Sequence, residues 1–270
     1  MASSCVSLYR RADRVNLEII MSMRAAIVTG ASSGIGEATV RLLVSQGIPT
    51  LATGRCEERL RALEADYSCD AGRIATIAAD VGEDGFAKRL FSEAGKKLGR
   101  IPDIYVLSAG IGLAGTLLKS KRDRWEQLIR VNYVSALGQM RDCVEIWTAD
   151  HNQCVQIRDL VVIGSTVGRQ ISPMNPVYGS TKFALHSLVE GLRQEVCHSG
   201  IRVTLIEPGF VVSRFQSAAE YDMGWFRSME TESGPLLRPE DVARVIDFVV
   251  RSPAHVHIDD VRVRPTRQKG

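Results

Sequence analysis

The chain has 270 residues, 45% of them hydrophobic, and its 34 basic and 31 acidic side chains give a formal net charge of +3. This length suits one large α/β domain or two small ones, and the interspersed charges predict neither a nucleic-acid partner nor a membrane-surface partner. No apolar run reaches the ~18 residues that a membrane-spanning helix needs. The six cysteines are scattered without a Cys-x-x-Cys pair, so we expect reduced thiols in a cytoplasmic protein, with no disulfide framework and no metal site.

Residues 1–23 differ from the rest of the chain. Their arginines and serines are typical of a targeting peptide, but Asp13 and Glu18 contradict the acid-poor composition of such peptides. We therefore expect a disordered extension over residues 1–23 and a folded domain over residues 24–270.

Short apolar segments alternate with amphipathic segments from residue 25 to the end of the chain. The apolar segments predict strands at 25–29, 50–53, 74–78, 104–107, 160–163, 203–206 and 256–263. The amphipathic segments predict helices at 34–45, 57–66, 86–98, 124–147, 177–197 and 239–250. No internal repeat interrupts this alternation, which is typical of a parallel sheet with helices on both faces. We therefore predict an α/β fold in one domain, with a doubly wound, parallel, seven-stranded sheet of the Rossmann type.

Two histidines, His255 and His257, alternate along the predicted closing strand and would therefore share one face of it. No cysteine or carboxylate cluster accompanies them in the sequence. We therefore expect no metal ion at this pair.

A glycine-rich turn separates the first predicted strand from the first predicted helix. Glycines at such a place let the chain turn tightly and let its backbone approach a pyrophosphate at a helix N-terminus. The spacing is Gly-x-x-x-Gly-x-Gly, and its position between strand and helix favours a nucleotide site over a plain tight turn. The predicted cofactor-binding residues of this turn are Gly30, Ser32, Ser33, Gly34, Ile35 and Gly36.

Tyr178 and Lys182 lie four residues apart in the helix predicted at 177–197, so both project from one face of it. An ammonium held near a phenol favours phenolate, and we therefore expect Lys182 to lower the pKa of Tyr178 from its usual ~10. A tyrosine tuned in this way can pass a proton to or from a substrate oxygen. The pattern by itself also fits an exposed helical pair, so its chemistry depends on what surrounds it.

The glycine turn, followed far downstream by Tyr178-x-x-x-Lys182, resembles the short-chain dehydrogenase/reductase family, and the resemblance covers nearly the whole chain from Met23 onward. It implies an oxidoreductase that transfers hydride between a nicotinamide cofactor and a carbonyl or alcohol carbon. It also implies two further catalytic residues, which are Ser165, thirteen residues before Tyr178, and Asn132 in the long helix after the fourth strand. Members of the family are commonly tetramers, so we expect a homo-tetramer or a homo-dimer.

The resemblance also implies a role for each catalytic residue. Tyr178 acts as the acid/base, and Ser165 hydrogen-bonds the same substrate oxygen. Lys182 tunes Tyr178 and holds the nicotinamide ribose, while the carbonyl of Asn132 holds a water that links Lys182 to solvent. The chain is longer than is usual for the family between Asn132 and Ser165, and we expect the extra residues in a polar loop at 149–158, remote from the chemistry.

The residue after the second predicted strand decides the expected cofactor. NAD-preferring members of the family carry an acidic residue there, whereas this chain has Gly54 followed by Arg55. Without a carboxylate to repel it, a 2′-phosphate can pair with Arg55, so we predict NADP(H). Asp80 and Val81 match the family's adenine contacts, although Asp80 also fits a cap of the next helix.

The remaining cofactor contacts implied by the resemblance follow the fourth and sixth strands. Ser108 replaces an asparagine whose amide bridges strands in the family, so we expect weaker local support there. Ser213 keeps the hydroxyl that a threonine commonly offers to the nicotinamide carboxamide. The set comprises Ser108, Ala109, Gly110, Pro208, Gly209, Val211 and Ser213, together with Tyr178 and Lys182.

Two segments, 170–177 and 210–235, are expected to line the substrate cleft, the second as a mobile lid rich in aromatic residues. The tail from His257 to Gln268 resembles the ending of the NADP-dependent 3-hydroxy acid (serine) dehydrogenases, a group that includes clavulanate-type aldehyde reductases. We therefore expect a small-molecule substrate that is interconverted between a secondary alcohol or hydroxy acid and its carbonyl compound. The alternatives are a 3-oxoacyl thioester (acyl-carrier-protein) reductase and a non-catalytic NADP-binding sensor on the same fold.

Overall fold

The structure of the protein is a computed structural model that describes residues 24–67, 73–150 and 157–269. The predicted extension at 1–23 and most of the predicted polar loop at 149–158 lie outside the described residues. Among the helices that are described, none is both long enough and apolar enough to cross a membrane.

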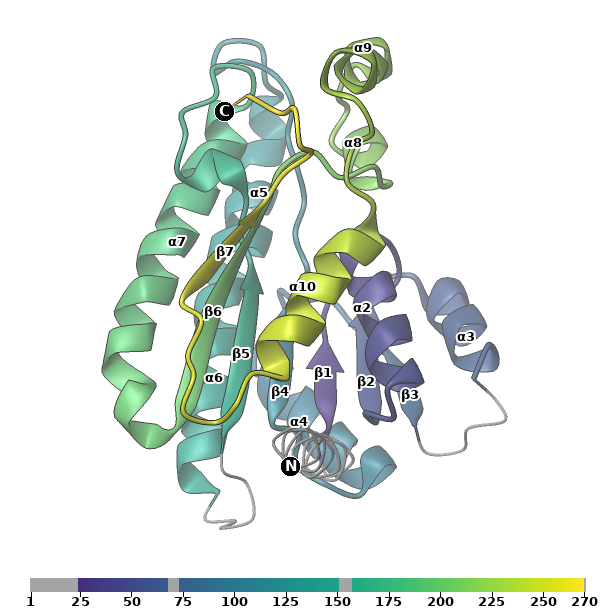
Figure 1. The fold of residues 1–270 in the computed structure, drawn as a ribbon, viewed down its shortest axis with the longest axis vertical. Helices are drawn as coiled ribbons and strands as arrows, with labels where there is room; N and C mark the ends of the chain where they lie inside the picture. The colour runs from purple at the N-terminus through teal and green to yellow at the C-terminus, as the bar shows by residue number, and fades with distance from the viewer. Residues whose placement is uncertain (1–23, 68–72, 151–156, 270) are drawn as a thin grey trace, which may run out of the picture.

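A parallel sheet runs through the centre of the described residues, with its strands in the order β3-β2-β1-β4-β5-β6-β7 (Figure 1). The strands are β1 (Ala26–Val28), β2 (Thr50–Gly54), β3 (Ile74–Ala78), β4 (Ile104–Leu107), β5 (Arg158–Ile163), β6 (Ile201–Pro208) and β7 (Asp260–Val263). The central strands are buried on both faces, which is why they read as unbroken apolar runs in the sequence. The prediction of a doubly wound, seven-stranded parallel sheet is confirmed.

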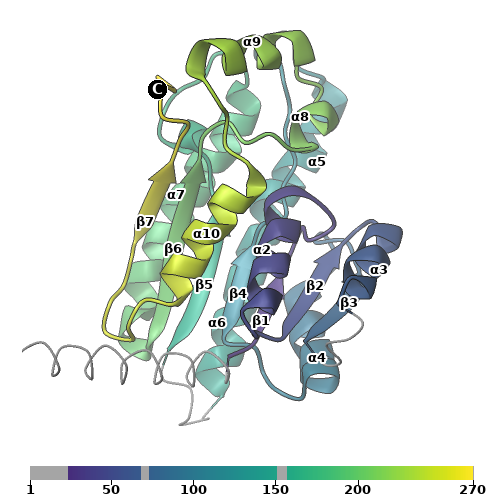
Figure 2. The same cartoon turned by 45° about the vertical axis from the view of Figure 1, so that its right-hand side comes forward.

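Helices cover both faces of this sheet (Figures 1 and 2). One face carries α2 (Gly34–Ser45), α3 (Glu57–Ala65) and α10 (Pro239–Val250), and the other carries α4 (Phe86–Leu98), α6 (Ser135–Ala149) and α7 (Pro176–Val196). Two further helices, α8 (Phe215–Ala218) and α9 (Met223–Ser233), stand beyond the ends of the strands. Single 3₁₀ turns lie at Arg122–Arg124, Thr166–Gly168 and Cys197–Ser199.

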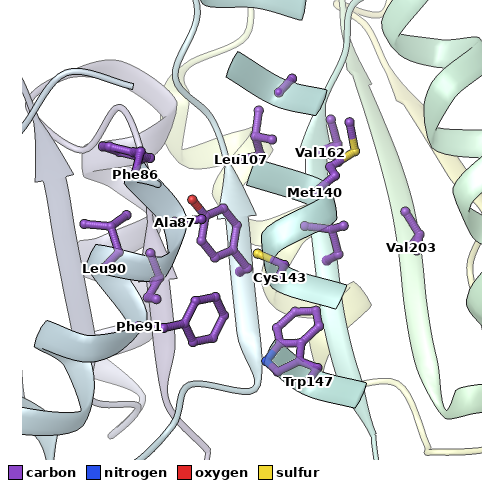
Figure 3. Close-up of a cluster of buried hydrophobic side chains, with 14 of the residues drawn as sticks. Phe86, Ala87, Leu90, Phe91, Leu107, Met140, Cys143, Trp147, Val162 and Val203 are labelled. Atoms are coloured by element: carbon purple, nitrogen blue, oxygen red, sulfur yellow. The ribbon is translucent and has the colours of Figure 1, made fainter. Parts of the chain in front are cut away.

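Aromatic side chains form the centre of the core between the sheet and helices α4 and α6 (Figure 3). Phe91 stacks on Tyr105 with ring centroids 5.9 Å apart, and it meets Trp147 edge-on at 5.9 Å. The Trp147 indole N–H donates to the Pro102 carbonyl at 2.8 Å, so this large ring is buried without an unpaired donor. This packing fixes α4 and α6 against β4, whose C-terminal end leads into the site described below.

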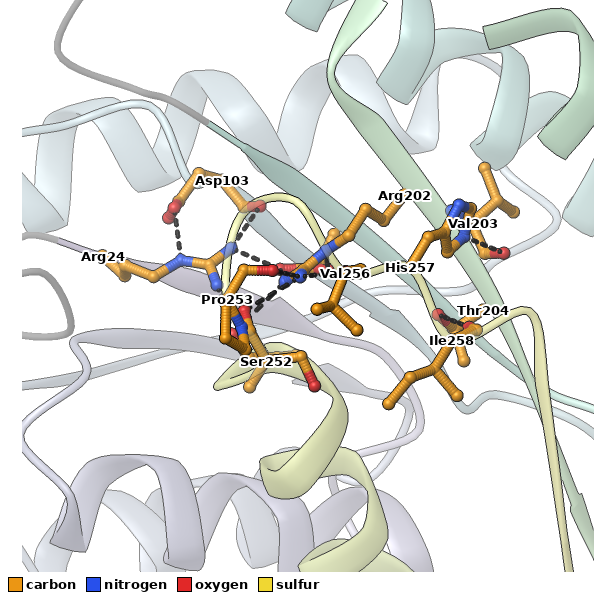
Figure 4. A network of polar contacts seen from close by, with 12 residues as sticks. Arg24, Asp103, Arg202, Val203, Thr204, Ser252, Pro253, Val256, His257 and Ile258 are labelled. Carbon is orange, nitrogen blue, oxygen red and sulfur yellow. Dashed lines mark hydrogen bonds and ion pairs between the residues drawn. The ribbon is translucent and has the colours of Figure 1, made fainter. Parts of the chain in front are cut away.

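A buried ionic network ties together the N-terminal ends of the central strands (Figure 4). The Arg24 guanidinium, just before β1, contacts the carboxylates of Asp103 and Asp159 at 2.6 and 2.7 Å. The Arg202 guanidinium of β6 contacts the Asp159 carboxylate of β5 at 2.7 Å. Because each charge faces an opposite charge, these four side chains can be buried at the end of the sheet away from the site.

The long helix predicted at 124–147 is interrupted. It consists of α5 (Trp125–Ile129), a π-helical turn (Arg130–Val134) and α6. A π-helical turn is rare and frequently lies at a functional site. The apolar periodicity of the sequence did not reveal it. Leu128 of α5 packs against Leu113 and Tyr178, whereas the buried side chains of α6 pack in the core with β4 and α4.

The closing strand is shorter than predicted, since β7 spans only Asp260–Val263. The prediction that His255 and His257 share a strand face is therefore wrong. The Nε2 atom of His257 instead lies 3.1 Å from both the amide and the carbonyl of Val203, and this contact joins the segment before β7 to β6.

The segment predicted as a mobile lid at 210–235 contains the helices α8 and α9, which the sequence reading missed. The Asp222 carboxylate caps α9 by accepting hydrogen bonds from the amides of Gly224 and Trp225 at 2.7 and 3.2 Å. An aspartate just before a run with helical periodicity is a start signal, and it was available in the sequence.

Candidate active site

A cavity of about 710 Å³ opens at the C-terminal ends of the strands. It lies where the strand order reverses between β1 and β4, which is the usual ligand site of an open α/β sheet. Its walls come from the turns after β1, β2, β3, β4, β5 and β6, together with the start of α7 and the α8–α9 segment. A cavity of this size suits a cofactor or a small molecule.

The glycine turn after β1 forms a cradle for a phosphate. Gly30 has a φ of +69°, and a Cβ there would lie 2.9 Å from the Ala109 backbone. Gly34 has a φ of +60° and begins α2, whose preceding residue Ser33 makes no side-chain capping hydrogen bond. The first N–H groups of α2 therefore remain available for an anion at the wall of the cavity. The turn fits the pyrophosphate of a dinucleotide.

Two arginines line the cavity where β2 ends. Arg55 and Arg59 are exposed, and neither has an ion-pair partner among the described residues. A Cβ on Gly54 would lie 2.9 Å from the Ser32 hydroxyl, so the two turns meet closely at this end. Arg59 was not predicted, although its place four residues after Arg55 at the start of α3 was a usable signal.

Asp80 and Val81 also line the cavity, next to β3. The Asp80 carboxylate accepts a hydrogen bond from the Gly82 amide at 2.8 Å, within its own turn. It does not cap the next helix, because the residue before α4 is Gly85.

Thr29 supports the turn after β4, and the sequence reading missed this role. Its hydroxyl accepts hydrogen bonds from the amides of Ser108 and Ala109, both at 3.1 Å. Thr29 thereby holds the backbone of this turn, and the weaker support expected from a serine at position 108 remains a prediction. Ser108, Ala109 and Gly110 all line the cavity, as predicted.

Tyr178 and Lys182 lie one turn apart near the start of α7, and both are buried at the cavity wall. The Lys182 ammonium lies 5.9 Å from the centroid of the Tyr178 ring and donates to the Ile163 carbonyl at 2.8 Å. Burial lowers the pKa of Lys182 to about 8.

The pKa of Tyr178 is raised, mainly by burial, and the nearby hydroxyls of Tyr221 and Ser165 raise and lower it by less. The prediction of a lowered tyrosine pKa is therefore wrong for the free protein. The physical reason is that removal of the phenol from water disfavours phenolate more than the cation 5.9 Å from the ring centroid favours it. At neutral pH Tyr178 is consequently a proton-bearing phenol.

Ser165 follows β5 and faces the same cavity. Its backbone is extended, with φ −171° and ψ 155°, and its hydroxyl accepts a hydrogen bond from the Val167 amide at 3.3 Å. Its amide in turn donates to the Nε2 atom of His186 at 3.3 Å. The structure thus brings Ser165, Tyr178 and Lys182 to one wall, from positions that the sequence separates by up to seventeen residues.

Asn132 lies in the π-helical turn and is buried behind the cavity wall. Its side-chain amide accepts from the Ile111 N–H and donates to the Ile111 carbonyl, both at 2.8 Å, and it also donates to the Thr181 hydroxyl at 3.2 Å. These bonds brace the loop after β4 against α7. The water that we expect at the Asn132 carbonyl remains a prediction.

The turn after β6 closes the cavity from the other side. The predicted contacts Pro208, Gly209, Val211 and Ser213 all line the cavity, and the Ser213 Cβ would lie 3.6 Å from a Cβ on Gly34. The side chain of Gln268, in the C-terminal tail, accepts from the Phe210 amide at 3.0 Å and fills the space beside Gly209. This contact between the tail and the turn was not predicted.

Aromatic side chains enclose the end of the cavity near Tyr178. Phe215 of α8 meets the Tyr178 ring edge-on, with centroids 5.6 Å apart, and Trp225 of α9 also lines the cavity. The Tyr221 hydroxyl accepts from the Asn175 side-chain amide at 2.6 Å, which joins the α8–α9 segment to the start of α7. Residues 170–175 and parts of 210–226 line this cavity, whereas the binding of the substrate there remains a prediction.

The comparisons with known proteins agree with this geometry. The family model described as short chain dehydrogenase matches residues 24–223. Human (Homo sapiens) dehydrogenase/reductase SDR family member 11 is 31% identical over 257 residues, which cover 91% of this chain and 95% of that protein.

Solved structures are similar over the same range. A closed form of serine dehydrogenase complexed with NADP⁺ aligns with a TM-score of 0.78 and 28% identity, covering 91% of this chain and 96% of that chain. Serine dehydrogenase from Escherichia coli aligns with a TM-score of 0.74 and 26% identity, covering 91% of this chain and 100% of that chain. From the match of sequence, fold and cavity, the chain belongs to the short-chain dehydrogenase/reductase family, oxidoreductases that use a nicotinamide cofactor and act on CH–OH groups.

Proposed function

We propose that this protein is an NADP(H)-dependent oxidoreductase that interconverts a secondary alcohol or hydroxy acid and its carbonyl compound, with Tyr178 as the acid/base. The observation that carries the proposal is the meeting of Tyr178, Lys182 and Ser165 at one cavity wall. The phosphate cradle after β1 lines the same cavity. The proposed dinucleotide site and the proposed proton donor, Tyr178, thus line the same cavity.

The preference for NADP(H) rests on charge. Arg55 and Arg59 line the cavity after β2, and β2 ends in Gly54 rather than in an acidic residue. The carboxylate of Asp80, which follows β3 and also lines the cavity, accepts a hydrogen bond from the Gly82 amide within its own turn. Two guanidinium groups favour a 2′-phosphate, which they can hold through charge-assisted hydrogen bonds. The NADP⁺ complex of the similar serine dehydrogenase is consistent with this preference.

A bound nicotinamide supplies or accepts the hydride, and the residues of the chain manage the proton and the charge. In the reducing direction, Tyr178 gives its phenol proton to the substrate oxygen as negative charge develops there. Ser165 donates a hydrogen bond to the same oxygen and stabilises that charge. Lys182 stabilises the phenolate that Tyr178 becomes after it has given up its proton. Lys182 therefore acts on the deprotonated form of Tyr178 and does not lower the pKa of Tyr178 in the free protein.

The apolar wall formed by Phe215 and Trp225 favours a substrate whose body is at least partly apolar. L-serine, 3-hydroxyisobutyrate, acetoacetyl thioesters and a panel of aldehydes and ketones separate the substrate classes. Turnover confined to thioesters identifies a 3-oxoacyl reductase instead. Cofactor binding without turnover of any compound identifies a non-catalytic sensor.

The test of the proposal is Tyr178→Phe, which keeps the ring and removes the proton donor. We expect kcat to fall by about 10²- to 10⁴-fold, while NADPH binding, followed by nicotinamide fluorescence, stays within about twofold. Tyr67→Phe is the matched control, because its hydroxyl contacts the Arg41 carbonyl at 3.3 Å and Tyr67 does not line the cavity. Near-normal turnover by Tyr178→Phe contradicts the proposal.

We also infer that residues 24–270 form one domain that assembles as a homo-dimer or homo-tetramer. Exposed apolar side chains along α5, the π-helical turn, α6 and α7 support this inference; they are Ile129, Val134, Leu137 and Phe183. Light scattering after size exclusion measures the assembly, and a monomer at micromolar concentration contradicts it.

A further inference from the structure

His186 occupies a place behind the catalytic wall that the proposed mechanism does not use. It lies on α7 one turn after Lys182 and two turns after Tyr178, so the three side chains share one stripe of the helix. Unlike the other two, His186 does not line the cavity. Its ring sits beneath the loop that carries Ser165.

The imidazole makes a directed contact with this loop. The Ser165 amide donates to the Nε2 atom of His186 at 3.3 Å. Because an amide can only donate, Nε2 is the unprotonated nitrogen of the ring, and the proton of the neutral ring resides on Nδ1. The Nδ1 atom is buried and has no hydrogen-bond partner among the described residues.

The loop itself is shaped around the ring. Gly164 and Gly168 stand on either side of the Ser165–Val167 segment, and a Cβ at either glycine would collide with the imidazole. The ring therefore fills a space that exists only because both positions lack side chains. An apolar side chain could fill the same space, but only a side chain with an acceptor atom can also receive a hydrogen bond from the Ser165 amide.

The charged groups around the ring keep it neutral. Burial, followed by the nearby cations Lys182 and Arg169, lowers the pKa of His186 to about 4. From β7, Asp260 opposes this change and Arg262 adds to it. Nε2 consequently remains a hydrogen-bond acceptor at neutral pH.

We propose that His186 is a positioning residue for Ser165, whose amide it holds so that the Ser165 hydroxyl stays beside Tyr178. This proposal rests on the proposed function above, and it adds to that function a residue that does not touch the reacting atoms.

The test is a double-mutant cycle between His186 and Ser165. In the wild-type background we expect His186→Leu to lower kcat by about 3- to 10-fold, which corresponds to the loss of one hydrogen bond. The Kd for NADPH is expected to stay unchanged. In the Ser165→Ala background we expect His186→Leu to have no further effect, because the group that it positions is gone. An equal loss of kcat in both backgrounds overturns the proposal.

Two variants separate positioning from general support. His186→Gln offers an acceptor oxygen near the place of Nε2 and is expected to restore most of the lost kcat. His257→Leu is the control, because it also removes a contact between Nε2 and the backbone, at 3.1 Å from the amide and the carbonyl of Val203, outside the cavity wall. We expect its kcat to equal that of the wild type, and a loss as large as that of His186→Leu contradicts the proposal.

A second measurement does not depend on turnover. Hydrogen exchange of the Ser165 amide, followed by NMR, is expected to be at least about tenfold faster in His186→Leu than in the wild type. Equal exchange rates overturn the proposal even if the enzyme is active. If no carbonyl compound is turned over but the exchange difference is present, the proposed function fails and the positioning contact stands.

Discussion

The Thr29 hydroxyl accepts a hydrogen bond from the Ser108 amide at 3.1 Å, and it accepts a second from the next amide, that of Ala109, at the same distance. One side chain after β1 thereby holds the turn after β4, at the point where the strand order reverses. The backbone of this turn forms part of the wall against which the cofactor is proposed to bind. The Thr29 hydroxyl thus joins the turn after β1 to the turn after β4.

We expect Thr29→Val to weaken both the fold and the site. The change leaves two backbone amides without their acceptor, which costs about 1–3 kcal/mol of the free energy of unfolding. The Kd for NADPH is expected to rise with it, because the turn loses its brace. Thr39→Val is the control, since among the described residues the Thr39 hydroxyl bonds the Ile35 carbonyl of its own helix and Thr39 itself does not line the cavity. Urea unfolding and cofactor titration measure both effects, and equal losses in the two variants contradict the prediction.

Arg55 and Arg59 are expected to set the choice of cofactor. Replacement of both by alanine removes the charge-assisted bonds to a 2′-phosphate, each worth about 1.5–3 kcal/mol, and should raise the KM for NADPH by at least about tenfold. The kcat/KM with NADH should change little. Arg61→Ala serves as the control, because Arg61 pairs with Glu57 on α3 and does not line the cavity. A parallel loss with both cofactors is the outcome that contradicts this prediction.

The pH dependence of reduction is expected to follow Lys182. Burial lowers the pKa of Lys182 to about 8, so the free protein loses this charge as pH rises through that value. Loss of the cation destabilises the phenolate that Tyr178 becomes, and kcat/KM for reduction should therefore fall above about pH 8. Lys182→Met should be slow and should show no such decline. A profile for the wild type that stays flat from pH 7 to pH 9.5 rules out this role.

The ionic network at the N-terminal ends of the strands is expected to contribute to the free energy of unfolding and to leave kcat unchanged. Asp159→Asn leaves the buried guanidinium groups of Arg24 and Arg202 without their shared carboxylate, which costs about 3–5 kcal/mol of the free energy of unfolding. Asp66→Asn, which breaks an exposed pair with Arg41, should cost less than about 1 kcal/mol. Under conditions where both variants are folded, kcat should equal that of the wild type.

Much of the fold could be predicted because its signals are local. A buried parallel strand is an apolar run and an amphipathic helix is a repeating pattern, so six of the helices and all seven strands were found, several with their observed bounds. The π-helical turn at Arg130–Val134 and the helices α8 and α9 were missed. Of the two missed helices, α8 has only four residues, and α9 lies in a segment whose aromatic residues line the cavity.

For the candidate site, the sequence by itself determined which residue types stand at which spacing. The shape of the glycine turn depends on the backbone conformation of a few neighbouring residues, among them Gly30 and Gly34. Tyr178 and Lys182 share a helix face because they are four residues apart. These relationships are set along the chain, before any packing occurs.

Only the tertiary structure decided how the site is charged and held. Burial keeps Tyr178 a phenol and lowers the pKa of Lys182, and burial depends on every element that surrounds the cavity. The contacts of Thr29 with Ser108 and of His186 with Ser165 join residues that are 79 and 21 positions apart. No local pattern records such pairs, because each forms only when the strands and helices that carry its members are packed into the sheet.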